Sequence, residues 1–328
     1  MPAPEGAHAP ALGPAPATLP AAAGVAIDAA SEPRPSRWRA ALDRLDTDLR
    51  LRLLAPGDPR GHWLAAQFDL TDIESKVKNL ASARVDAPDD RLYLASLAFA
   101  CMQPTRPQLP ACAALDRLAD WAIRDAGNGV PTFLLGFRAL ERGQANAAVA
   151  YVDEAAAAPR YDDYWSKGPQ QWWSYLRPLA IDIDPVAKAK AAATYALEHD
   201  LGWTGALHLL CAGPGGRTEP MRVACAKLGT AMGERAATFA LRRAGARIAE
   251  IDAADAKSRA AAQAQSARIL EASARCAVDE PDFEAAFESP DRRVRMRGID
   301  EFDAWVSAQA TDGEAAACER LPAATRRH

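Results

Sequence analysis

The six cysteines are the residues of this sequence best suited to chemistry, because a thiol can ligate a metal ion, attack an electrophile or form a disulfide. They are Cys101, Cys112, Cys211, Cys225, Cys276 and Cys318. No Cys-x-x-Cys motif occurs and no histidine follows at zinc-ligand spacing, so we expect no metal site. An even number of cysteines with two close pairs favours disulfides and an oxidising compartment. The alternative is six buried, reduced thiols, since free cysteine is among the most buried residue types.

One sequence unit with two cysteines occurs twice. Residues 95–101 and 205–211 read as helices that end in cysteine, and each precedes a proline-containing loop and an Ala-Cys-Ala-x-Leu motif, at 111–115 and 224–228. A disulfide across each hairpin mouth is sterically reasonable and would contribute about 3 kcal/mol by the loop-entropy estimate. We predict one disulfide in each unit and, by elimination, a third between the remaining cysteines, although six cysteines allow fifteen pairings. The predicted pairs are Cys101-Cys112, Cys211-Cys225 and Cys276-Cys318.

The histidines are the next candidates for catalysis or metal binding. His199 and His208 flank a break in the helical pattern, at a spacing that matches no metal-binding helix. Leucines surround His208, which predicts a core position. His62 lies beside Trp63, and the local sequence offers no carboxylate to orient it. We therefore assign no catalytic residue, no metal ligand and no cofactor.

Two further patterns have a simpler structural interpretation. The Gly-Pro-Gly-Gly segment at 213–216 lacks the Lys-Ser/Thr pair and the preceding strand of a phosphate-binding loop, so we interpret it as a hairpin loop. The acidic pairs Asp89-Asp90 and Asp162-Asp163 begin predicted helices. Negative charge is favourable there because it complements the helix dipole.

The densest aromatic segment of the chain is the strongest candidate for a binding surface. Three of the eight tryptophans and three of the six tyrosines lie between residues 161 and 175. On a single helix most of these rings share one face, which favours core packing, and the alternative is a ligand-facing groove. Trp173 lies off that face, so we expect it to be the most exposed ring. The candidate binding residues are Tyr161, Tyr164, Trp165, Lys167, Trp172, Trp173, Tyr175 and Arg177, of which Lys167 and Arg177 could complement an acidic partner.

The elements that position these residues are predicted to be helices throughout. Beyond Pro35 nearly every segment has helical period, and no strand-like alternation is sustained. The first helix should span 36–54 with an apolar stripe of Trp38, Leu42, Leu45, Leu49 and Leu53. Further helices are expected at 60–68, 71–83, 89–101, 109–126, 131–143, 145–158, 161–177, 185–199, 203–211, 219–232 and 235–251. A long helix near 254–276, with few large apolar residues, and two short ones within 282–318 complete the prediction.

Residues 131–160 are predicted to form two antiparallel helices with small residues between them. The first helix carries a Leu-Gly pair, the second carries alanines, and a glycine lies at the turn. The residues that form this pattern are Phe133 to Phe137, Ala139, Gly143, Ala148, Tyr151 and Ala155 to Ala158. At these positions the chain resembles one unit of the tetratricopeptide and Sel-like helical-repeat superfamily. Thr132 and Arg160 depart from the pattern, where Trp and Pro are common. The resemblance implies an all-α, solenoid-like stack of antiparallel helical hairpins that is used for protein contacts.

Charge and composition narrow the function classes. With 39 basic and 43 acidic residues spread along the chain, the net charge of −4 gives no basic surface for nucleic acid, and no stretch is apolar enough for a transmembrane helix. The Ala/Pro-rich residues 1–34 read as a disordered tether without a signal peptide's basic start. We expect a helical-repeat domain at 35–252, a helical extension at 253–320 and a frayed tail at 321–328.

These observations favour a non-catalytic, protein-binding protein of the bacterial cell envelope, either periplasmic or secreted. One alternative is an envelope enzyme acting on peptidoglycan or polysaccharide, with an acid such as Asp162, Asp163 or Glu198 as catalyst. Another is an inhibitor or immunity protein of such an enzyme. A deep cleft with paired acids would favour the enzyme, and a shallow groove would favour binding.

Overall fold

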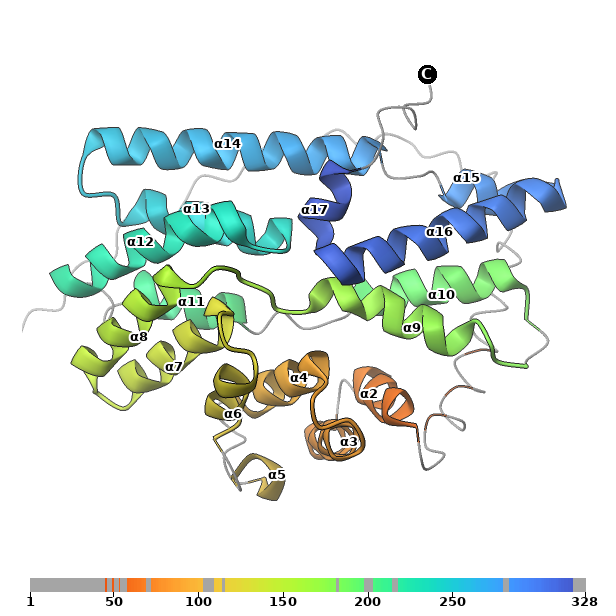
Figure 1. Ribbon diagram of the computed structural model, residues 1–328, viewed down its shortest axis with the longest axis horizontal. Helices are drawn as coiled ribbons and strands as arrows, with labels where there is room; N and C mark the ends of the chain where they lie inside the picture. The colour runs from red at the N-terminus through yellow and green to blue at the C-terminus, as the bar shows by residue number, and fades with distance from the viewer. Residues whose placement is uncertain are drawn as a thin grey trace, which may run out of the picture. The chain divides into compact units, whose positions relative to one another are not determined.

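The computed structural model describes residues 45, 49, 53, 58–68, 72–102, 109–113, 116–180, 183–197, 203–213, 218–279 and 283–320. Helices packed against one another make up nearly all of this part of the chain (Figure 1). The described residues contain no strand, and their only extended pairings are the bridges Asn128 to Arg160 and Tyr161 to Ala236. The predicted all-α stack of helical hairpins, stapled by disulfides, is therefore confirmed.

The helices lie close to their predicted positions. In chain order they are α2 (Pro59–Phe68), α3 (Ile73–Asp86), α4 (Arg91–Met102), α5 (Pro110–Ala113), α6 (Arg117–Arg124), α7 (Gly129–Glu141), α8 (Ala145–Ala157), the 3-10 helix η1 (Trp165–Lys167), α9 (Gly168–Leu176), α10 (Pro185–Leu197), α11 (Trp203–Cys211), α12 (Glu219–Arg235), α13 (Phe239–Ile251), α14 (Ala256–Asp279), α15 (Phe283–Glu288), α16 (Arg292–Asp312) and α17 (Glu314–Glu319).

Three predicted helices differ from the structure. The helix expected at 109–126 is two helices, because Asp116 caps a new one by accepting hydrogen bonds from the backbone N–H groups of Leu118 and Ala119. The helix expected at 161–177 begins only at η1. The second short helix expected before residue 318 is instead the long α16 followed by α17, with Gly313 at a φ of 84° between them.

The pair α7 and α8 forms the hairpin that the small residues predicted. Gly143 adopts a φ of 72° at the turn between the helices. A Cβ atom at Gly136 would lie 3.3 Å from the carbonyl oxygen of Ala148 and 3.3 Å from Val152 Cγ2, so the two backbones approach closely there. The next hairpin, α12 and α13, packs against α8 through α12.

Glycines allow the backbones of α12 and α13 to approach each other closely. A Cβ at Gly229 would lie 2.6 Å from the carbonyl oxygen of Gly245, and a Cβ at Gly245 would lie 2.7 Å from the backbone nitrogen of Gly233. Only glycine permits this separation, because any side chain would meet backbone atoms of the other helix.

The remaining predictions concern the first helix, the two chain ends, helix α14 and transmembrane helices. Leu45, Leu49 and Leu53 are helical and buried as expected, while the rest of the helix predicted at 36–54, the tether at 1–34 and the tail at 321–328 lie outside the described residues. Helix α14 packs on α13 and exposes most of its surface, as its composition predicted (Figure 1). No helix in the described residues is long and apolar enough to span a lipid bilayer.

Candidate functional site

All six cysteines form disulfides, in the three pairs that the sequence predicted. The Cα–Cα distances are 5.4 Å for Cys101–Cys112, 5.7 Å for Cys211–Cys225 and 5.5 Å for Cys276–Cys318. No free cysteine remains, so the alternative of six reduced thiols is not what the structure shows. Each disulfide joins helical segments, and none leaves a thiolate available as a nucleophile or a metal ligand.

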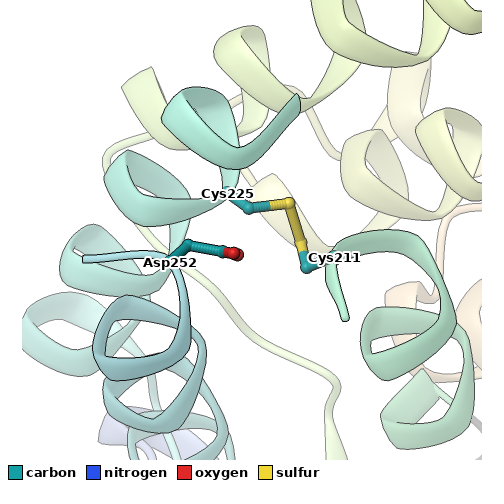
Figure 2. A group of neighbouring side chains, drawn as sticks. All are labelled: Cys211, Cys225 and Asp252. Atoms are coloured by element: carbon teal, nitrogen blue, oxygen red, sulfur yellow. A yellow bond between two sulfur atoms is a disulfide. The ribbon is translucent and has the colours of Figure 1, made fainter. Parts of the chain in front are cut away.

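A buried carboxyl group points at one of these disulfides. Asp252, at the end of α13, lies beside the sulfurs of Cys211 and Cys225 (Figure 2), and the three potential ligand atoms are all within 4.8 Å of one another. Its Oδ2 atom is buried without a hydrogen-bond partner, and burial raises the pKa of this carboxyl to about 6. Because both sulfurs are in the disulfide, the group is a desolvated acid against a sulfur bridge and not a metal centre.

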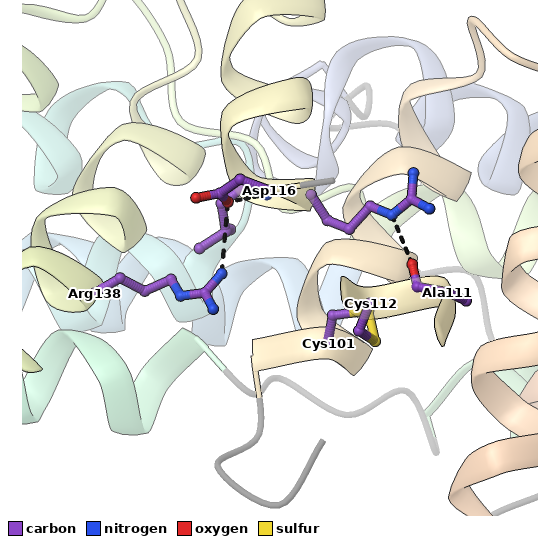
Figure 3. Close-up of a disulfide and its surroundings, with 7 residues drawn as sticks. Cys101, Ala111, Cys112, Asp116 and Arg138 are labelled. Atoms are coloured by element: carbon purple, nitrogen blue, oxygen red, sulfur yellow. Dashed lines mark hydrogen bonds and ion pairs between the residues drawn. A yellow bond between two sulfur atoms is a disulfide. The ribbon is translucent and has the colours of Figure 1, made fainter. Parts of the chain in front are cut away.

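The Cys101–Cys112 disulfide fastens the short helix α5 to the end of α4 (Figure 3). The backbone carbonyl of Ala111 accepts a hydrogen bond of 2.9 Å from Arg117 Nε, and Asp116, before α6, lies 3.5 Å from Arg138 Nη1 on α7. Helix α5 has four residues and cannot hold its position by helical hydrogen bonds alone. The disulfide and the arginine contact therefore fix it beside α3.

A groove of about 590 Å³ lies between α3 and α5, and we call it the α3–α5 groove. Its apolar lining comes from Val77, Ala81 and Val85 of α3 and from residues 109–111 at α5. Val85 is 78% exposed, although most large aliphatic side chains in the described residues are buried. His62, Glu74, Lys78, Ser82 and Asp86 supply its polar lining.

Two histidine positions differ in their surroundings. His62 Nδ1 is buried without a hydrogen-bond partner, and its Nε2 lies 4.0 Å from Oδ2 of Asp86, a carboxylate that is distant in sequence. His208 is exposed on α11, so its predicted core position is wrong. The leucines around it suggested an apolar setting, but on a helix neighbouring residues face different directions, and Leu209 is exposed as well. His199 lies outside the described residues.

The aromatic segment is mostly core. Tyr161, Tyr164, Trp172, Trp173 and Tyr175 are buried, and only Trp165 is half-buried. The expectation that Trp173 is exposed is wrong, because α16 covers α9 and leaves this ring 2% exposed. Its Nε1 donates a 2.7 Å hydrogen bond to Asp303 on α16, which also pairs with Arg177 at 2.7 Å.

The first part of this segment is not helical, so its rings do not share one helix face. Residues 160 and 161 are extended, and their carbonyl groups accept hydrogen bonds from the backbone nitrogens of Gly129 (2.9 Å) and Ala237 (2.8 Å). Tyr164 adopts a φ of 62°, a left-handed conformation that is uncommon for a residue with a side chain. Lys167 Nζ lies 4.7 Å from the centroid of the Tyr164 ring. The described contacts of Lys167 include no ion pair with an acidic side chain.

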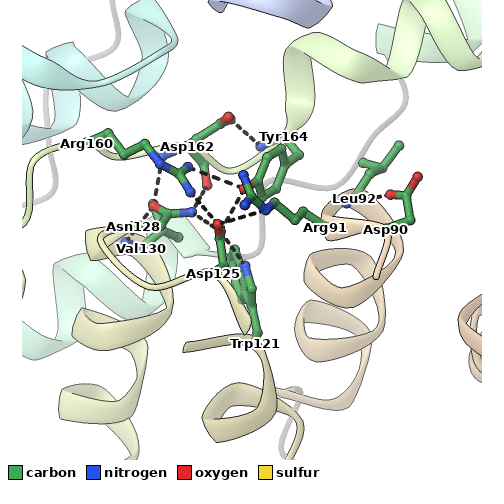
Figure 4. Close-up of polar contacts among 10 residues, drawn as sticks. All are labelled: Asp90, Arg91, Leu92, Trp121, Asp125, Asn128, Val130, Arg160, Asp162 and Tyr164. Atoms are coloured by element: carbon green, nitrogen blue, oxygen red, sulfur yellow. Dashed lines mark hydrogen bonds and ion pairs between the residues drawn. The ribbon is translucent and has the colours of Figure 1, made fainter. Parts of the chain in front are cut away.

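The left-handed turn at Tyr164 is held by a buried network centred on Asp125 (Figure 4). The Asp125 carboxylate accepts hydrogen bonds from Tyr164 OH at 2.7 Å, Asn128 Nδ2 at 2.8 Å and Trp121 Nε1 at 3.0 Å. Arg160 also pairs with it, and Arg91 Nε lies 3.4 Å away. A buried carboxylate with this many donors is fully satisfied, which indicates a structural role.

A second buried acid, Asp163, lies in the loop before η1. Asp163 Oδ2 accepts a 2.8 Å hydrogen bond from Trp203 Nε1, and Oδ1 accepts one of 3.2 Å from the backbone N–H of Trp165. Desolvation by burial, with a smaller contribution from neighbouring Asp162, raises its pKa to about 7. Asp163 lines neither the α3–α5 groove nor the cavity described next, and Glu198, the third acid considered for catalysis, lies outside the described residues.

Trp165, the half-buried ring of the predicted cluster, lines a cavity. This space of about 380 Å³, which we call the aromatic cavity, is lined by residues of η1, α9, α10 and α13 to α17. Four more aromatic side chains line it, none of them from the aromatic segment of the sequence: Phe239, Phe283, Phe302 and Trp305. Local sequence pattern does not reveal these four, because they come from three different helices up to about 140 residues from Trp165.

Comparison of the chain with models of protein families, with curated proteins and with solved structures gave no match. The resemblance of residues 131–160 to a helical-repeat unit therefore stays an expectation, and function has to be inferred from the chain's own geometry.

Proposed function

We propose that this chain is a non-catalytic binding protein of the bacterial cell envelope, which holds an apolar segment of a protein partner in the α3–α5 groove. Three disulfides support an oxidising compartment, either periplasmic or extracellular, because cysteines in reducing compartments are mostly kept as thiols. The groove itself carries the proposal of binding.

The apolar lining of the groove favours contact with a protein partner over contact with water. Val77, Ala81 and Val85 recur at the spacing of one helix face on α3. Opposite them lie Leu109, just before α5, and Pro110, the first residue of α5. Val85 is an exposed aliphatic side chain of this concave apolar surface. Its burial against a partner would lower the free energy of the complex. A volume of about 590 Å³ accommodates a few apolar side chains, as in the docking of a short segment.

The polar lining indicates the charge of the partner segment. Glu74 and Asp86 bring two carboxylates to the groove, and Lys78 brings one cation. The excess of negative charge favours an apolar segment that also carries a basic residue. His62, whose Nε2 lies 4.0 Å from Oδ2 of Asp86, adds a further polar side chain to the lining.

The disulfide prepares this surface for binding. Residues 109–111 form one wall and precede Cys112 directly, so the Cys101–Cys112 bond holds the wall in place before a partner arrives. A preorganised surface loses less conformational entropy on association than a flexible one. The disulfides therefore contribute to binding through rigidity, with no chemical role of their own.

The experiment places a photo-crosslinking amino acid at Val85 and, as a control, at Leu209, an exposed aliphatic residue on α11 that does not line the groove. Irradiation in the source organism should give a discrete adduct from position 85 only. The adduct's partner should carry an apolar segment with a basic residue at the crosslink. The purified partner should bind the wild type and Leu209→Asp but lose affinity at least about tenfold for Val85→Asp. Equal labelling at both positions, or unchanged binding by Val85→Asp, would contradict the proposal.

A further inference from the structure

The aromatic cavity has the size and lining of a small-molecule site. Its volume of about 380 Å³ falls in the range of ligand pockets in proteins. Trp165 and Phe283 are half-buried, whereas Phe239, Phe302 and Trp305 are buried. The cavity therefore combines a buried aromatic interior with partly exposed rings.

Two of the cavity rings, Phe302 and Phe283, make aromatic contacts. Phe302 meets Phe283 edge to face at a centroid distance of 5.5 Å, and it meets Trp173 in the same way at 5.4 Å. Such pairs favour fixed ring orientations because the positive edge of one ring faces the negative face of the other. The part of the lining formed by Phe302 and Phe283 is therefore preorganised and does not depend on a ligand for its shape.

The charge of the lining is negative. Among the residues that line the cavity, Glu314 is the only ionisable side chain outside the disulfide, and no lysine, arginine or histidine takes part. Its Oε2 accepts a 2.9 Å hydrogen bond from the backbone N–H of Phe239, which fixes the carboxylate at the wall. Ser273 and Gln309 add neutral polar groups.

We propose that the aromatic cavity binds a small organic cation of the substituted ammonium class, such as a quaternary ammonium group. The faces of aromatic rings attract cations through the ring quadrupole, most strongly for tryptophan and where the cation is desolvated. Glu314 adds a Coulombic attraction that a neutral ligand of the same shape does not gain. The proposal is independent of the protein partner at the α3–α5 groove, since the two sites share no residue.

The third disulfide supports the same site. Cys276 lines the cavity from α14, and its partner Cys318 lies in α17, the short helix that carries Glu314. The bond ties the carboxylate-bearing helix to the cavity wall. It thereby keeps Glu314 close to the aromatic rings.

Calorimetric titration tests the proposal with probes that differ in charge alone. Choline and its uncharged isostere 3,3-dimethyl-1-butanol have nearly the same shape, so we expect saturable binding of choline and at least about tenfold weaker binding of the alcohol. Tetramethylammonium should bind as choline does. Equal affinity for choline and the alcohol would show a merely apolar cavity, and no saturable heat with either cation would also overturn the proposal.

Two variants assign the binding to this cavity. Glu314→Gln keeps an oxygen acceptor for Phe239 but removes the charge, and Trp165→Leu removes a half-buried ring, so each should weaken choline binding at least about tenfold. Glu319→Gln, an exposed carboxylate on the same helix, is the matched control and should bind normally. Circular dichroism melts confirm that each variant is folded. Wild-type affinity in folded Glu314→Gln and Trp165→Leu would place the binding elsewhere and contradict the assignment.

Discussion

Trp203 Nε1 donates a 2.8 Å hydrogen bond to Oδ2 of Asp163, and both side chains are buried between α11 and the loop before η1. The carboxyl group is desolvated, and its pKa is raised from 3.8 to about 7. The folded state therefore binds a proton that the unfolded state releases between about pH 4 and pH 7.

The consequence is a stability that falls as the pH rises. The contribution of Asp163 is fully present below about pH 4 and is lost as the pH passes through 7, on the order of a few kcal/mol in all. Urea unfolding from pH 4.5 to 8 should show the decline, and Asp163→Asn should reduce the slope. Asp252, with a pKa of about 6, contributes in the same direction, and Asp252→Asn is the companion variant. Equal slopes in the wild type and Asp163→Asn would contradict the assignment.

Two glycine-to-alanine substitutions, one where α12 and α13 approach closely and one on α11, should change the stability in opposite directions. Gly245→Ala puts a Cβ 2.6 Å from Met232 Cβ and 2.7 Å from the Gly229 carbonyl oxygen, and overpacking of this kind costs about 1–3 kcal/mol. Gly205, inside α11, has open space around its Cβ position, so Gly205→Ala should raise the free energy of unfolding by up to about 1 kcal/mol. Denaturant unfolding measures both. A destabilised Gly205→Ala beside an unaffected Gly245→Ala would contradict the close approach.

The disulfides lead to two predictions, one for the free energy of unfolding and one for the oxidation state of the cysteines in the native protein. Replacing Cys276 and Cys318 together by alanine should lower the free energy of unfolding by about 3–4 kcal/mol, since the bond closes a loop of 42 residues. Mass spectrometry of unreduced protein from its native source should show three disulfides. Six free thiols in that material would contradict the proposed compartment.

Much of the fold could be predicted because it depends on local pattern. Apolar spacing located most helices, and the duplicated cysteine unit identified two disulfides, from which the third pair followed. The Gly229-x-x-x-Gly233 spacing on α12 is a local signal of a close helix contact that the predicted helix positions did not include. The N-cap Asp116, which begins α6, is a second local signal of this kind.

The aromatic segment could not be interpreted from local pattern. Its helical periodicity is real, but the backbone of residues 160 and 161 pairs with loops at 128–129 and 236–237, and Tyr164 turns toward a carboxylate 39 residues earlier in the chain. Tertiary hydrogen bonds of this kind override helix propensity and have no signature in a single sequence. The aromatic cavity was missed for the same reason, because its rings meet only after the helices pack.

Asp125 is the residue on which this long-range arrangement depends, and it provides the last prediction. Asp125→Ala removes the acceptor of Tyr164, Asn128 and Trp121 and leaves Arg160 without its partner, so we expect a loss of about 3–5 kcal/mol in the free energy of unfolding.

The matched control is Asp89→Ala, which also removes an aspartate paired with an arginine. Asp89 is 89% exposed and lies 3.1 Å from Arg124, and such surface pairs contribute less than about 1 kcal/mol. Denaturant unfolding at pH 7 compares the two variants directly. Tyrosine and tryptophan near-UV circular dichroism should also change in Asp125→Ala alone, because its carboxylate orients the rings of Tyr164 and Trp121. Similar small losses in both variants would show that the buried network does not hold the turn at Tyr164, and that the left-handed backbone there is maintained by packing instead.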